Sequence, residues 1–206
     1  MSEPSSLYMR VRLTKMSLEA FRQSQLAAPR QYDDWQTWLS SQKFYGAISD
    51  EDIQAIEPPD AMQQSTIARM FASGLGRALP EIPAENRPLL VDEYLDFTVK
   101  SIFWGPSRSD YDTESQTWTL CIPQHSENYG DFIRELAILR TVAQYKDLPG
   151  EDFILIYPYF WGGSPNTFVT IHQGSSILKN EAPAQAIAEA DAALQSLIRN
   201  AYQGEI

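Results

Sequence analysis

Residues 152–172 read DFILIYPYFWGGSPNTFVTIH, and this stretch decides the expected fold. The run from Phe153 to Phe160 is apolar on both faces, which predicts a strand in the middle of a sheet. A Gly-Gly-Ser-Pro-Asn turn follows, and Thr167 to His172 forms the next strand. Two strands joined by such a turn are typical of a β-hairpin, so the stretch favours an antiparallel sheet.

An earlier stretch, residues 96–122, matches this hairpin. Both stretches begin with Asp-Phe, continue to Phe-Trp-Gly, and end in a strand that starts with Thr and an aromatic residue. One long amphipathic helix follows each stretch, predicted from Ser126 to about Lys146 and again around Pro183. We therefore predict a strand–turn–strand–helix unit used twice, with strands at Leu95–Trp104 and Thr117–Ile122 in the first copy. Both helices are expected on one face of the sheet.

Residues 1–88 predict one strand and several short helices. Leu7 to Thr14 alternates apolar and charged residues, which favours a half-buried strand that adds an edge to the same sheet. Helix starts are expected at Ser17, at Asp33 or Asp34, at Ser49 with Asp52, and at Asp60. A proline-rich connector over residues 78–88 leads to the second half. The predicted fold class is α+β in one domain, residues 1–206. Its antiparallel sheet is built from the two C-terminal repeats, and the N-terminal part adds a strand and short helices.

Composition and charge exclude several classes of protein. The 206 residues include one cysteine, Cys121, which excludes an intramolecular disulfide and a cysteine-rich zinc module. Sixteen basic and 27 acidic residues give a net charge of −11, so a groove for phosphate backbones is not expected. Residues 89–206 carry −9 of this charge. The excess serves either solubility or the docking of a basic partner, and charge alone leaves both interpretations open.

The N-terminus has no basic segment followed by an apolar one, so a secretory signal is not expected. The longest apolar run, residues 153–161, is shorter than the ~20 residues of a membrane-spanning helix and contains Pro158. One free thiol and no export signal predict a cytoplasmic protein without a membrane contact.

Metal and nucleophile chemistry have few candidate residues. A metal site would need both histidines, His125 and His172, with a carboxylate such as Asp131 or Glu135, and their spacing does not favour it. No metal or cofactor is therefore expected. Cys121 could act as a nucleophile with a histidine, although a packed thiol explains it more simply. An enzyme with a scattered site around these Cys and His residues remains an alternative.

The stretch Asp110-x-Asp112-x-Glu114 resembles the start of a calcium loop. Its sixth position is Ser115 instead of Gly, and its twelfth is not Glu, which excludes an EF-hand. We place these three acids in a polar loop over residues 105–115. That loop is either simply solvated or an acidic contact surface.

The elements Trp104-Gly105 and Trp161-Gly162-Gly163 mark the two predicted hairpin turns. With the surrounding chain from about Tyr94 to His172, they resemble a small immunity-protein family of bacterial polymorphic toxin and type VI secretion systems. The resemblance implies a compact cytosolic α+β protein that binds and neutralises a cognate toxin, commonly a nuclease. It carries over no catalytic residues, since such proteins inhibit by binding.

An acidic protein of this kind fits the inhibition of a basic nuclease, because a surface that attracts phosphates also attracts carboxylates. The main alternatives are the enzyme described above and a non-catalytic subunit of another complex. Direct binding of nucleic acid is not expected. The residues predicted to contact the toxin are Asp110, Asp112, Glu114, Glu127, Asp131, Trp104 and Trp161.

Overall fold

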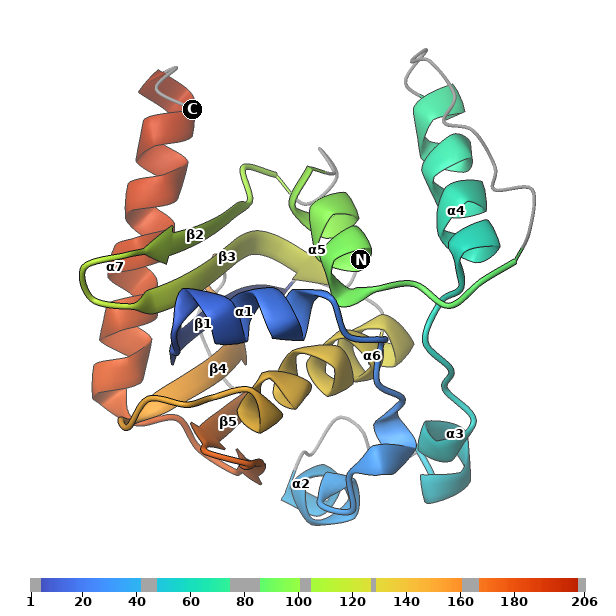
Figure 1. Cartoon of the computed structure of the whole chain (residues 1–206), viewed down its shortest axis with the longest axis horizontal. Helices are drawn as coiled ribbons and strands as arrows, with labels where there is room; N and C mark the ends of the chain where they lie inside the picture. The colour runs from blue at the N-terminus through green and yellow to red at the C-terminus, as the bar shows by residue number, and fades with distance from the viewer. Residues whose placement is uncertain are drawn as a thin grey trace.

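Six strands form one sheet in the computed structural model, which describes residues 5–41, 48–74, 86–100, 105–126, 129–160 and 167–203. The strand order is β2-β3-β1-β4-β5-β6, and every neighbouring pair is antiparallel (Figure 1). The predicted α+β class and antiparallel sheet are confirmed. The strands are β1 (Ser5–Arg12), β2 (Arg108–Asp112), β3 (Thr117–Ser126), β4 (Asp152–Tyr157), β5 (Thr167–His172) and β6 (Ser175–Lys179).

The N-terminal strand β1 lies in the middle of this sheet. Met9 pairs with Leu120 of β3 on one side and with Ile154 of β4 on the other. The prediction of an edge strand with one solvated face was therefore wrong. The charged residues that suggested a solvated face, Arg10 and Arg12, contact carboxylates of neighbouring elements instead.

Helices cover both faces of the sheet (Figure 1). Helix α7 packs on one face, where Leu155, Ala190 and Leu194 are buried together. The other face carries a larger core that includes Trp118, Ile154 and residues of the other packed helices. The helices around this larger core are α1 (Lys15–Arg22), α2 (Trp35–Ser41), α3 (Asp50–Gln54), α5 (Val91–Lys100) and α6 (Tyr129–Arg140), whereas α7 spans Ala184–Gln203.

The expectation that both repeat helices share one face was wrong, because α6 and α7 lie on opposite faces. Successive side chains of a strand point to opposite faces. Every residue of β4 is buried, so Ile154 packs in the α6 layer and Leu155 in the α7 layer. A strand that is apolar on both faces needs a cover on each, which one layer of helices cannot supply.

Several predicted helix starts are confirmed. Helix α2 follows Asp34, and α4 (Ala61–Gly74) follows Asp60, whose Oδ1 accepts a hydrogen bond from the Gln63 N–H at 2.7 Å. Ser49 and Asp52 form the capping box of α3. Helix α1 begins three residues earlier than predicted, because its N-cap is Thr14 and not Ser17.

The strand predicted at Leu95–Trp104 is wrong, because α5 occupies Val91–Lys100; residues 101–104 lie outside the described part of the chain. Val91, Tyr94, Leu95 and Thr98 are its buried residues, at the i, i+3, i+4, i+7 spacing of a helix face. The β-branched and aromatic residues between them suggested a strand, but burial follows the helical period.

Two strands were missed. Residues 108–112, assigned to a polar loop, form β2, in which exposed and partly buried residues alternate as on an edge strand. Residues 175–179 form β6. Each half still has a hairpin before a long helix, β2–β3–α6 and β4–β5–β6–α7. However, the two Asp-Phe pairs that begin the predicted repeats are not structurally equivalent. Asp96-Phe97 lies in helix α5, whereas Asp152-Phe153 lies in strand β4.

Two 3-10 helices are also present among the described residues. Helix α6 ends at Arg140 instead of near Lys146 and continues as the 3-10 helix η3 (Thr141–Gln144), and a second 3-10 helix, η1, spans Pro29–Gln31. In the described ranges, no helix has the length and apolar character that crossing a membrane requires.

Candidate functional site

The acidic hairpin consists of Asp110 on β2 with Asp112 and Glu114 at its turn into β3. All three residues are exposed. Asp112 fixes the turn, because its Oδ1 accepts the Glu114 N–H at 2.9 Å and its Oδ2 accepts the Ser115 hydroxyl at 2.9 Å. These hydrogen bonds lower the pKa of Asp112, so it stays ionised over the physiological range. Asp110 forms an ion pair with Arg108, which offsets one of the three charges.

A fourth carboxylate, Asp147, lies at the same end of the sheet. It accepts hydrogen bonds from the Thr14 N–H at 2.9 Å and from the hydroxyls of Thr14 and Ser17 at 2.6 and 2.8 Å. Burial alone would raise its pKa, but these hydrogen bonds outweigh burial and lower it. Tyr111 of β2 donates a hydrogen bond to the Leu13 carbonyl at 3.0 Å, next to Thr14. Its pKa is raised by burial and then by the charges of Asp147 and Asp112. Sequence reasoning missed Asp147, which is distant from the hairpin along the chain.

Of the other predicted contact residues, the structure describes only Asp131, which does not join the acidic hairpin. Asp131 lies in the first turn of α6, after β3, whereas the hairpin turn precedes β3. Ten strand residues separate the two places, which corresponds to roughly 30 Å. Asp131 also forms an ion pair with Arg134 at 2.5 Å. The remaining predicted contacts, Trp104, Glu127 and Trp161, lie outside the described residues.

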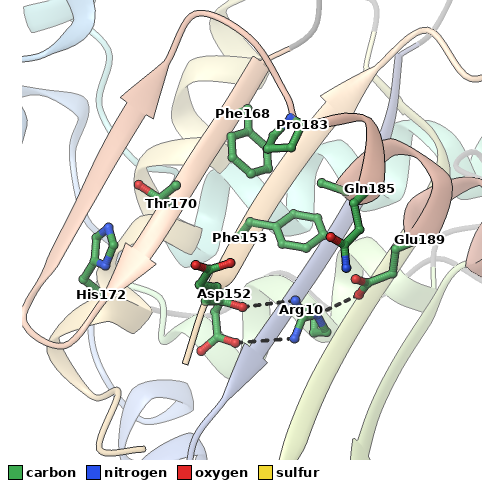
Figure 2. Close-up of a pocket in the computed structure, with 11 residues that line it drawn as sticks. Arg10, Asp152, Phe153, Phe168, Thr170, His172, Pro183, Gln185 and Glu189 are labelled. Atoms are coloured by element: carbon green, nitrogen blue, oxygen red, sulfur yellow. Dashed lines mark hydrogen bonds and ion pairs between the residues drawn. The ribbon is translucent and has the colours of Figure 1, made fainter. Parts of the chain in front are cut away.

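A hollow of about 320 Å³ opens between the β4–β5 pair and the start of α7 (Figure 2). Its apolar lining comes from Phe153, Phe168, Pro183 and Ala186. The two phenylalanine rings are tilted against each other with centroids 5.4 Å apart. Sequence reasoning did not find this hollow, because its lining comes from segments separated along the chain.

Charged groups on the rim of the hollow already contact one another (Figure 2). Arg10 Nε lies 2.7 Å from Glu189 Oε1, and its guanidinium sits 5.3 Å from the centre of the Phe153 ring. Tyr8 also donates a hydrogen bond to Glu189, at 2.8 Å. Burial, followed by this hydrogen bond, raises the pKa of Tyr8 above its ordinary value. The rim therefore joins β1 to α7, and the charges of Arg10 and Glu189 offset each other.

Beneath this rim, Asp152 is fully buried and is surrounded by cations. It forms an ion pair with buried Lys146 and accepts hydrogen bonds from the Arg12 backbone N–H at 3.1 Å and Arg12 Nε at 3.3 Å. Gly150 makes room for the Arg12 guanidinium, since a Cβ at this glycine would lie 1.7 Å from Arg12 Nη2. The network joins β1, β4 and the preceding loop, and we interpret it as structural.

The residues of the alternative enzyme site are spread over the molecule. Cys121 is buried under α7, and burial raises its pKa to about 12, which keeps the thiol protonated at neutral pH. His125 is buried towards α6, with Nε2 at 2.9 Å from Glu135 Oε2. His172 is exposed on β5, at the hollow. The three side chains do not form one site.

The described residues contain no group of three His, Cys, Asp or Glu side chains placed to hold a metal ion. No family model, curated protein or solved structure matches the chain. The resemblance to immunity proteins therefore stays a prediction.

Proposed function

We propose that this protein is an immunity-type inhibitor, which binds a basic toxin through the acidic hairpin and thereby neutralises it. The exposed carboxylates of Asp112 and Glu114, in a turn fixed by hydrogen bonds, carry the proposal. Charges held in a defined geometry lose little entropy when a cationic surface docks on them.

Electrostatic attraction supports this role. The chain has a net charge of −11, so its field attracts a cationic protein from beyond contact distance. A nuclease needs a positive surface to hold its nucleic acid. An acidic inhibitor placed over that surface competes directly with the substrate, which requires no catalytic residue of its own.

Cysteine and histidine chemistry has weaker support. Cys121 is protonated at neutral pH, and the two histidines lie on other parts of the molecule. At the hollow beside α7, Arg10 is already paired with Glu189 and Asp152. Binding by the exposed acidic hairpin is the function that the arrangement of charges favours.

Affinity capture with the tagged chain at low salt, in the native cell, tests the proposal. We expect one stoichiometric basic protein that arrests growth when expressed alone and is tolerated when this chain is expressed with it. The purified partner should also lose its activity on nucleic acid when the chain is added. Capture of an acidic or non-toxic housekeeping complex, or of no stoichiometric partner, would contradict an immunity function.

A further inference from the structure

The sheet has two edge strands, β2 and β6, and an edge strand presents backbone N–H and C=O groups that can pair with another chain. On β6 these groups are occupied. The Leu178 N–H donates to Asp34 Oδ2 at 2.9 Å, and the Ser176 carbonyl accepts from Arg140 Nη2 at 3.1 Å. Asp34 and Arg140 also bind each other through two hydrogen bonds of 2.8 and 2.7 Å. This clamp closes the β6 edge.

The β2 edge is different. The Leu13 N–H donates to the Gln116 carbonyl at 3.0 Å, just before β3 begins. In an antiparallel sheet, every second residue after Gln116 therefore directs its backbone hydrogen bonds towards β1. The intervening residues of β3 face β2, opposite Arg108, Asp110 and Asp112. The backbone groups of Ser109 and Tyr111 therefore point away from the sheet. In the ranges that the structure describes, no hydrogen bond occupies these backbone groups.

The charged side chains beside this open edge favour pairing with a basic strand. Asp110 and Asp112 are exposed on the same face of β2, and Glu114 follows in the turn. A strand that paired with β2 would place its own side chains next to these carboxylates, where opposite charges attract and like charges repel. Arg108 lies at the other end of β2, where it would repel a positive charge. A cationic residue of the added strand therefore fits best near the turn.

We propose that an extended, basic segment of the partner protein pairs with β2 as a seventh strand of the sheet. This inference rests on the proposed function, because the acidic hairpin must bind a basic protein before its edge can accept a strand. Backbone hydrogen bonds to Ser109 and Tyr111 supply affinity, and the carboxylates supply charge selection.

Two synthetic peptides of equal charge test the pairing. The first alternates lysine and valine over seven residues, and the second alternates lysine and proline, which lacks the N–H donor that a strand requires. Titration at low salt should show that the lysine–valine peptide binds at least about tenfold more tightly. Hydrogen exchange should then show protection of the Ser109 and Tyr111 amides on addition of this peptide.

Substitution of Ser109 separates backbone pairing from charge. Ser109→Pro removes an outward N–H that the β2–β3 ladder does not use, and proline is tolerated on edge strands. Ser109→Ala is the matched control, since both variants lose the hydroxyl that accepts the Trp118 indole N–H at 2.9 Å. We expect Ser109→Pro to weaken lysine–valine binding about tenfold relative to Ser109→Ala.

Equal binding of the two peptides, with no protection of the two amides, would overturn strand pairing even if Ser109→Pro failed to fold. The proposed function would survive that result if neutralisation of the acidic hairpin still weakened binding of both peptides. If neither peptide bound and neutralisation changed nothing with the captured partner, the acidic hairpin would not be the contact, and both proposals would fail.

Discussion

The two edges of the sheet use their carboxylates in opposite ways. At β6, Asp34 binds a guanidinium that is only 1% exposed, and the pair closes the edge strand. At β2, Asp112 and Glu114 are exposed, and the hydrogen bonds of Asp112 stay within its own turn. A carboxylate that compensates a buried cation contributes mainly to stability. A carboxylate fixed at the surface keeps its charge available to a partner.

The largest effect is expected at the closed edge. Asp34→Ala leaves the buried Arg140 without its carboxylate, and an uncompensated buried charge costs about 3 kcal/mol or more. Asp33→Ala is the matched control, because Asp33 is the exposed neighbouring aspartate. Its free energy of unfolding should stay within about 0.5 kcal/mol of the wild-type value. Urea denaturation measures both, and similar losses in the two variants would refute the role of the clamp.

A smaller effect is expected at Asp147, which lies at the same end of the sheet as the acidic hairpin but stabilises the fold through hydrogen bonds to Thr14 and Ser17. Asp147→Asn keeps an oxygen acceptor and removes the charge, so it should lower the free energy of unfolding by about 1 kcal/mol at pH 7. Glu151→Gln, on the same connection, serves as the control and should have little effect.

The same variant has a defined pH dependence. The pKa of Asp147 is lowered in the folded protein. Its contribution is therefore present above the ordinary aspartate pKa of about 4 and is lost as the pH falls through the lower folded pKa. Denaturation measured between pH 2 and pH 7 should show the free energies of unfolding of the wild type and Asp147→Asn becoming equal at the lowest pH. A constant difference across this range would mean that the charge is not responsible.

The smallest effect concerns the pH dependence of binding. Hydrogen bonds lower the pKa of Asp112, so its charge persists in mild acid. Affinity for the captured partner should therefore change little between pH 5 and pH 8 when titration of the partner is accounted for. Affinity could instead fall with a midpoint between pH 5 and pH 8, and Glu114→Gln could leave that fall unchanged. Such a result would indicate that a histidine, and not the acidic hairpin, controls binding.

Local sequence signals predicted much of the fold. The apolar run of β4, the capping box at Ser49 and the proline before α7 each act within a few residues, and the structure places an element at each. Helix α5 was mistaken for a strand, although Val91, Tyr94 and Thr98 carry a helical spacing that could have been recognised. The alternation in β2 was also visible, but its charged residues favoured a loop.

Contacts between distant segments could not be predicted. The faces covered by α6 and α7, and the central place of β1, depend on how the whole sheet assembles. Asp34 and Arg140 are 106 residues apart, and nothing in either local pattern indicates that they meet. Asp147 reaches Thr14 in the same way. Of the predicted acidic contacts, the sequence placed the hairpin group together but could not reveal that Asp131 lies at the far end of β3.

The rate of association with the captured partner tests the central claim most directly. D110N/D112N/E114Q removes the charge of the acidic hairpin, and D33N/E51Q/E181Q removes the same charge from exposed acids elsewhere. At low salt we expect the hairpin variant to associate about tenfold more slowly than the control variant, with a flatter dependence on ionic strength. Equal rates and equal salt dependence in the two variants would contradict binding through the acidic hairpin.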